Sequence, residues 1–160
     1  MTEFRASPVG AGRRIAIVIS RFNGNVTSRL LAGARACLLE HGVDDDSIDV
    51  ISVPGAWELP QAARWAADRG SYSAIVALGC VIRGETPHFD FVAGPAADGL
   101  AGIALDSRIP VTLGLLTTED MEQALARAGG RHGNKGWDAA EAALELAALR
   151  SRLGSEIAGT

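Results

Sequence analysis

The sequence predicts an α/β protein, a three-layer α/β/α sandwich around a four-stranded parallel sheet. Short and continuously apolar runs, typical of strands buried on both faces, alternate along the chain with longer segments whose apolar residues have helical spacing. Strands separated by helices pair in parallel and place their helices on both faces of the sheet. The chain has 160 residues, of which 48% are hydrophobic and 21% charged, so we expect residues 1–160 to form one domain.

The first two strands lie in the first third of the chain. Ile15–Ser20 is an unbroken apolar run, which predicts a buried strand. Apolar residues recur at every third or fourth position of Val26–His41, as in a helix, and Gly42 follows as a stop signal. Asp49–Val53 is a shorter strand, because a Pro-Gly pair ends it. These segments form the first strand–helix–strand unit of the sheet.

The remaining segments repeat this alternation. Trp57–Arg69 is a helix closed by a glycine, and Ser73–Leu78 is the third apolar strand. After the next helix, His88–Leu105, a fourth strand follows; we place it at Pro110–Leu116. The last two helices are separated by a polar loop. They are Thr118–Ala128, whose first residue we expect to be the cap, and Asp138–Leu153, which is rich in Ala, Leu and Glu.

The composition excludes several classes of function. The net charge is −4 and there is no basic stripe, so nucleic acid is not an expected partner. No apolar run approaches the roughly 20 residues that span a bilayer, and the first residues lack the apolar core of a signal peptide. Cys37 and Cys80 lack the spacing of a metal site, and we expect both to be reduced thiols of a cytoplasmic protein.

The most informative segment is residues 79–91, Gly-Cys-Val-Ile-Arg-Gly-Glu-Thr-Pro-His-Phe-Asp-Phe. It follows the strand Ser73–Leu78 and leads through a glycine-containing turn to Thr86 and Pro87, which we interpret as the cap and first residue of a helix. Unpaired N–H groups at a helix N-terminus bind phosphate or carboxylate. His88, next in the sequence, is ionisable near neutral pH. This pattern predicts chemistry on a small phosphorylated molecule.

Other candidate residues gather where the expected strands end, which is where ligands bind in such sheets. The motifs of several enzyme classes are missing: Gly10-Ala11-Gly12 precedes the first strand instead of following it, and there is no Walker lysine loop, GxSxG or HExxH sequence. The first strand also ends without the acidic pair of a phospho-receiver domain.

From the residues alone, each candidate has two interpretations. Phe22 either stacks on a planar heterocycle or covers the end of the sheet. Glu58 either stabilises a helix N-terminus or recognises an amide or hydroxyl group of a ligand. His88 is either a structural histidine or a catalytic one, and Arg127 and Lys135 are either solvated charges or ligand contacts.

Five segments carry a specific resemblance to one enzyme family. They are Arg21–Asn23, Val53–Pro60, Ala77–Asp90, Gly114–Thr118 and Gly133–Gly136. In their order and spacing they resemble the 6,7-dimethyl-8-ribityllumazine synthases. The resemblance runs from about Ile15 to Leu149, nearly the whole chain, and the third segment is the most specific.

The resemblance implies a flavodoxin-like sheet and the penultimate step of riboflavin biosynthesis. In that step 5-amino-6-(D-ribitylamino)uracil condenses with 3,4-dihydroxy-2-butanone 4-phosphate to 6,7-dimethyl-8-ribityllumazine, with release of inorganic phosphate and two waters. We therefore expect a transferase that acts on two small molecules and needs no metal, flavin or nicotinamide cofactor.

The resemblance also assigns site residues. It implies that the pyrimidine and ribityl groups contact Phe22, Asn23, Ala56, Trp57, Glu58, Cys80, Val81, Ile82 and, from a neighbouring subunit, Leu113. It implies that the phosphate contacts Gly84, Glu85, Thr86, Arg127 and Lys135, and that His88 transfers protons. Three positions depart from the commoner pattern: Leu113 replaces a frequent aromatic, Trp57 replaces a frequent phenylalanine, and Glu85 puts a carboxylate beside a phosphate site.

Assembly follows from the same resemblance. We expect a homo-oligomer, a pentamer or a hollow icosahedral shell of sixty subunits, with the active site between neighbours and riboflavin synthase as a candidate partner. We expect residues 1–13 to form an arm that pairs with the sheet of a neighbouring subunit. Two alternatives are a flavin or lumazine carrier that has lost catalysis, and a shell protein whose main role is encapsulation.

Overall fold

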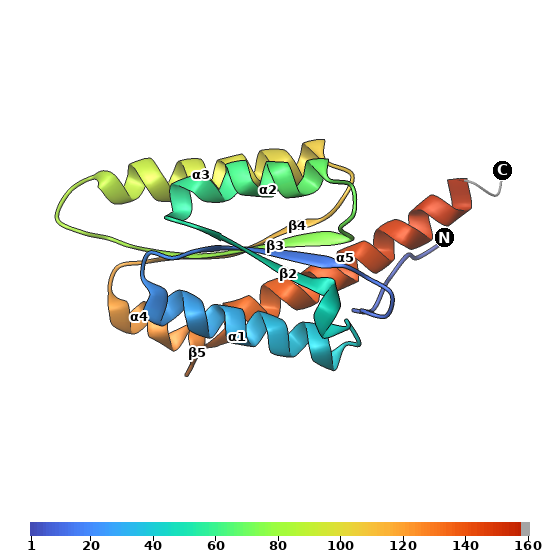
Figure 1. Cartoon of the computed structure of the whole chain (residues 1–160), viewed down its shortest axis with the longest axis horizontal. Helices are drawn as coiled ribbons and strands as arrows, with labels where there is room; N and C mark the ends of the chain where they lie inside the picture. The colour runs from blue at the N-terminus through green and yellow to red at the C-terminus, as the bar shows by residue number, and fades with distance from the viewer. Residues whose placement is uncertain (158–160) are drawn as a thin grey trace.

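Four parallel strands form the middle layer of the molecule, in the order β2-β1-β3-β4 (Figure 1). The computed structural model describes residues 1–157. The strands are β1 (Ile15–Ser20), β2 (Ile48–Val53), β3 (Ala74–Ile82) and β4 (Val111–Thr118). This arrangement confirms the predicted three-layer α/β sandwich with a flavodoxin-like sheet.

Helices cover both faces of the sheet. The helices are α1 (Gly24–Glu40), α2 (Leu59–Asp68), α3 (His88–Asp106), α4 (Met121–Ala126) and α5 (Lys135–Ile157), with short 3-10 turns η1 (Asp45–Ser47) and η2 (Ala56–Glu58). Figure 1 shows α2 and α3 on one face and α1, α4 and α5 on the other. Between α4 and α5, the strands β5 (Ala128–Gly130) and β6 (Gly133–Asn134) form a small antiparallel hairpin.

The core consists of two apolar layers, one on each side of the sheet. Alternate residues of a strand point to opposite faces, so Ile15 and Ile17 pack with buried residues of α1 and α5. Ala16 and Val18 pack with buried residues of α2 and α3. The continuous burial of β1 explains why its sequence is apolar without interruption.

Two boundaries near the candidate site differ from the prediction. The third strand ends at Ile82 and not at Leu78, because β3 continues to pair with β4 as far as the Ile82–Thr118 pair. Gly79–Ile82 is therefore strand, and the turn contains only residues 83–87. The predicted helix Trp57–Arg69 is divided, since the turn η2 precedes α2.

The two C-terminal helices also begin at other residues than predicted. Thr118 is the last residue of β4 and caps no helix. Asp120 caps α4 instead, because its carboxylate accepts a hydrogen bond from the backbone N–H of Gln123 at 2.8 Å. The helix α5 begins at Lys135, three residues earlier than predicted. There the side-chain oxygen of Asn134 accepts the N–H groups of the second and third helical residues at 2.8 and 3.2 Å.

The N-terminal segment contains no strand in this single chain. It lies beside the C-terminal part of α5 (Figure 1), where the guanidinium of Arg152 donates a hydrogen bond to the backbone carbonyl of Arg5. Within residues 1–157, no helix is long and apolar enough to cross a membrane.

Candidate active site

A cleft of about 750 Å³ lies at the carboxyl ends of β1, β2 and β3. It brings together most of the residues that the sequence singled out. Its lining consists of Phe22, Asn23, Pro54, Gly55, Ala56, Trp57, Glu58, Cys80, Val81, Ile82, Gly84, Thr86, His88, Phe89, Phe91 and Val92. The cleft therefore unites an aromatic rim, the backbone of a strand end and the turn before α3.

The loop after β1 is held to the neighbouring strands by hydrogen bonds. Asn23 precedes α1 in the left-handed conformation, with φ of 58°, and its amide donates to the carbonyl of Cys80 at 2.9 Å. The backbone N–H of Phe22 donates to the carbonyl of Pro54 at 3.0 Å. These contacts leave the Phe22 side chain 72% exposed at the cleft.

The turn η2 forms a second wall of the cleft. The Glu58 carboxylate accepts a hydrogen bond from the backbone N–H of Gly55 at 2.9 Å, and so stabilises the start of the turn. The same side chain is half-buried and lines the cleft. Trp57 stands at the rim with 60% of its surface exposed. Both interpretations of Glu58 are therefore compatible with its position.

The turn of residues 83–87 forms the third wall and leads into α3. Pro87 is the cap and His88 the first helical residue, one position later than predicted. The Thr86 hydroxyl nevertheless accepts a hydrogen bond from the N–H of His88 at 3.4 Å. Within the described chain, the backbone N–H groups of Gly84, Glu85 and Thr86 donate to no other group. Free N–H groups before a helix of 19 residues provide an anion site.

Four predicted site residues lie outside this cleft. Leu113 is on the edge strand β4 with 54% exposure, and Glu85 is exposed without lining the cleft. Arg127 donates to the carbonyl of Gln123 at 3.0 Å, and the ammonium of Lys135 lies 2.9 Å from the carboxylate of Asp138. A single chain thus lacks the two cations that the resemblance places at the phosphate.

Three cleft residues were missed in the sequence. Phe89, Phe91 and Val92 all follow His88 in the first turns of α3 and face the cleft. Two phenylalanines so soon after an anion-binding turn, where a helix usually begins with polar residues, are the signal that could have identified them.

The thiol in the cleft is not poised for reaction. Burial raises the pKa of Cys80 to about 11, so the thiol is protonated at neutral pH and a poor nucleophile. Burial likewise raises the pKa of Cys37 to about 12. Both cysteines are free. Among the described residues, no three His, Cys, Asp or Glu side chains are grouped as metal ligands.

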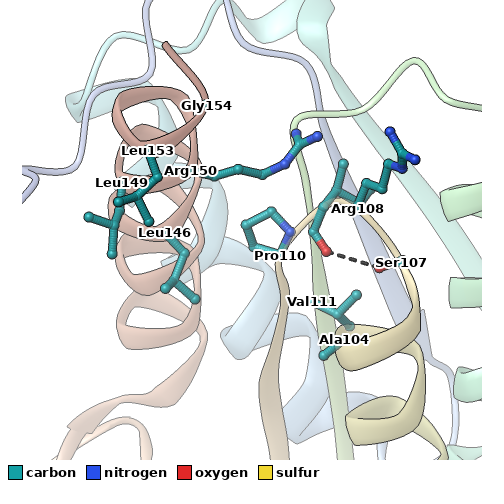
Figure 2. Close-up of a pocket in the computed structure, with 11 residues that line it drawn as sticks. Ala104, Ser107, Arg108, Pro110, Val111, Leu146, Leu149, Arg150, Leu153 and Gly154 are labelled. Carbon is teal, nitrogen blue, oxygen red and sulfur yellow. Dashed lines mark hydrogen bonds between the residues drawn. The ribbon is translucent and has the colours of Figure 1, made fainter. Parts of the chain in front are cut away.

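A second hollow, of about 520 Å³, lies near the opposite end of the sheet, between α3, the start of β4 and α5. Figure 2 shows leucines of α5 facing Pro110 and Val111, with Arg108 and Arg150 at the margin. Its lining contains no histidine, carboxylate or thiol. Acid–base chemistry therefore points to the first cleft.

The fold and the cleft define a flavodoxin-like α/β protein that binds a planar, anionic small molecule at the carboxyl ends of its strands. Comparison with known proteins narrows this class. The sequence profile of the 6,7-dimethyl-8-ribityllumazine synthase family matches residues 12–151, and the chain belongs to this family. A protein named 6,7-dimethyl-8-ribityllumazine synthase, from Gemmatimonas aurantiaca, is 59% identical over 152 residues, which are 95% of this chain and 93% of the relative.

Proposed function

We propose that the protein condenses 5-amino-6-(D-ribitylamino)uracil with 3,4-dihydroxy-2-butanone 4-phosphate to 6,7-dimethyl-8-ribityllumazine, with release of phosphate and two waters, in riboflavin biosynthesis. Family membership supports this reaction. The observation that carries it in the structure is the cleft, where an aromatic rim and a strand end meet unpaired N–H groups and His88.

The pyrimidine substrate suits the part of the cleft between β1 and η2. Phe22 and Trp57 present exposed rings, which stack well on a planar heterocycle. Asn23, Ala56, Glu58, Cys80, Val81 and Ile82 complete this part of the lining. Glu58 contributes carboxylate acceptors for ring or ribityl donors.

The butanone phosphate suits the turn before α3. The N–H groups of Gly84, Glu85 and Thr86, together with the positive end of α3, bind the phosphate and stabilise the charge that grows as it leaves. Glu85 takes part through its backbone, because its side chain does not line the cleft.

His88 lies beside this turn and is the proposed proton-transfer residue. The substrate amine attacks the ketone, and the resulting carbinolamine loses water to give an imine. Phosphate then leaves by elimination, the ring closes, and the second water departs. Each step moves a proton between nitrogen, carbon and oxygen atoms, which an imidazole can accept and return.

A neighbouring copy completes the site in this proposal. Leu113, Arg127 and Lys135 lie outside the cleft of their own chain, and the exposed rings at the rim offer a surface for a second chain. We propose a homo-oligomer, a pentamer or a sixty-subunit shell, in which residues 1–13 extend a neighbouring sheet. The open edge strands β2 and β4 leave room for such pairing.

Three finer points belong to the same proposal. Residues 1–160 form a single domain. The protein works in the cytoplasm, where its two free thiols stay reduced. Riboflavin synthase, which consumes the lumazine, is the candidate protein partner.

Mixing the purified protein with both substrates tests the reaction. Lumazine is followed by absorbance and fluorescence, and phosphate is measured in the same samples. We expect a rate above the spontaneous background and one phosphate per lumazine. A background rate with tight lumazine or riboflavin binding would instead support a carrier, and neither rate nor binding would support a shell protein. Size-exclusion chromatography separates a pentamer from a shell.

A further inference from the structure

Arg83 is the first residue after β3 and begins the turn that carries the anion-binding N–H groups. Its own backbone N–H donates to the carbonyl of Thr118 at 2.9 Å, which joins the turn to the end of β4. The side chain does not line the cleft. Arg83 was not among the predicted site residues, yet it contacts the elements on both sides of the turn.

The guanidinium of Arg83 makes three contacts. Its Nε atom donates to the Glu119 carboxylate, at 3.0 Å to Oε2 and 3.2 Å to Oε1. Its Nη1 atom lies 3.5 Å from Oδ1 of Asp90, in the first turn of α3. The guanidinium carbon also lies 4.3 Å from the ring centre of Phe89, which lines the cleft. One side chain thus links the end of β4 to the residues directly after His88.

These contacts contribute little to stability. The side chains of Arg83, Asp90 and Glu119 are 41%, 63% and 62% exposed, and ion pairs between exposed groups are worth little in water. Their charges have a larger consequence for the neighbouring turn. Without the guanidinium, two carboxylates would stand unpaired near an anion-binding site, and each would repel a phosphate dianion.

We propose that Arg83 is a positioning and charge-compensating residue for the phosphorylated substrate. It neutralises Glu119 and Asp90 beside the turn, and its contact with Phe89 fixes the start of α3 and therefore the place of His88. This inference rests on the proposed function and adds to it a residue that touches neither substrate.

The test compares Arg83→Ala, Arg83→Lys and the double variant Arg83→Ala/Glu119→Gln with wild type. Arg35→Ala is the matched control, because Arg35 makes a similarly exposed two-atom contact with Asp45, at 2.7 and 2.9 Å, on α1. Each variant is assayed for Tm, kcat and the KM of each substrate. Binding of inorganic phosphate, followed by ³¹P NMR line broadening, gives a readout that needs no turnover.

We expect Arg83→Ala to raise the KM of the butanone phosphate about fivefold, while the KM of the pyrimidine stays unchanged. Arg83→Lys should fall in between, because a lysine keeps the charge but not the planar two-atom contact. Glu119→Gln in the Arg83→Ala background should restore at least half of the lost affinity. Arg35→Ala should lower Tm by a similar small amount and leave both KM values unchanged.

Three results would overturn the inference: an unchanged phosphate KM in Arg83→Ala, an equal rise in both KM values, or no recovery in the double variant. A merely structural role predicts the last two. If wild type makes no lumazine, the proposed reaction fails, and phosphate binding then decides the inference by itself. If Arg83→Ala does not fold, Arg83→Lys and Glu119→Gln supply the same comparison.

Discussion

The side-chain amide of Asn23 donates a hydrogen bond to the backbone carbonyl of Cys80, with 2.9 Å between nitrogen and oxygen. This bond joins the loop after β1 to the end of β3, across 57 residues of sequence. Among the described residues, Asn23 is the non-glycine residue with positive φ, at 58°. Asparagine tolerates this conformation better than most residues, so backbone and amide together place Phe22 at the cleft.

We predict that Asn23→Ala lowers the free energy of unfolding by about 1–2 kcal/mol, because it loses one hydrogen bond and strains a left-handed backbone. Asn23→Gly is the control, since glycine removes the amide but accepts the positive φ. Urea unfolding of both variants separates the two costs. Equal stability of Asn23→Ala and wild type would show that the contact with Cys80 does not hold the loop.

The close approach of α1 and α5 gives a second prediction. A Cβ atom added to Gly136, at the start of α5, would fall on the backbone carbonyl of Leu30 in α1. Gly136→Ala should therefore lower the free energy of unfolding by about 2–3 kcal/mol, measured by urea unfolding. Gly154 in the same helix is the matched control, because a Cβ atom there meets nothing within 4 Å. Gly154→Ala should raise helix stability slightly.

The sequence predicted the fold where a pattern is local. The unbroken apolar run Ile15–Ser20 is β1 without any change, because a central strand is buried on both faces. The end of β3 depends instead on pairing with β4, which lies more than 30 residues further along the chain. For the same reason Thr118 was misplaced as a helix cap, because its position in the Ile82–Thr118 pair keeps it in the strand.

The candidate site shows the same division. Phe22, Ala56, Cys80 and His88 were placed together correctly, since the carboxyl ends of parallel strands meet at one edge. Arg83 was missed because its main partner, Glu119, is 36 residues away in the sequence. No pattern along a single chain marks a pair of exposed charges as neighbours.

The pair of β1 and β2 is tied at its start by a carboxylate that should make stability depend on pH. The hydrogen bond from the Tyr72 hydroxyl, at 2.7 Å, and the contacts with Arg14 hold the pKa of Asp49 below its usual range. A carboxyl group whose pKa is lower in the folded state stabilises the protein above its unfolded pKa of about 3.9, and this contribution is lost as the pH falls through the folded value.

We therefore expect the difference in Tm between wild type and Asp49→Asn to be largest above about pH 4 and to shrink below it. Tyr72→Phe should show part of the same effect and a loss of about 1 kcal/mol at neutral pH, since only one hydrogen bond is removed. Calorimetry from acid to neutral pH measures both variants. A Tm difference independent of pH would contradict the role of Asp49.

His88→Ala should slow lumazine formation about 10- to 100-fold without reducing it to the spontaneous rate. Proton transfer is lost, but the cleft still holds two reactive substrates together. The assay is the rate of lumazine formation at saturating concentrations of both substrates, with His132→Ala as control because His132 is exposed and lies outside the cleft. A rate equal to the background would mean that holding the substrates together contributes little.

Co-assembly of two inactive variants tests whether the active site lies between chains. In the proposed site His88 and Arg127 come from different subunits, whereas in one chain Arg127 contacts the carbonyl of Gln123. When His88→Ala and Arg127→Ala chains assemble together at random, about a quarter of the sites in a ring pair an intact His88 with an intact Arg127. Co-expressed chains with two different tags should therefore recover about a quarter of wild-type activity, while the variants assembled separately and then mixed should not. A site contained in one chain predicts no recovery in either sample, because each chain then carries one defect.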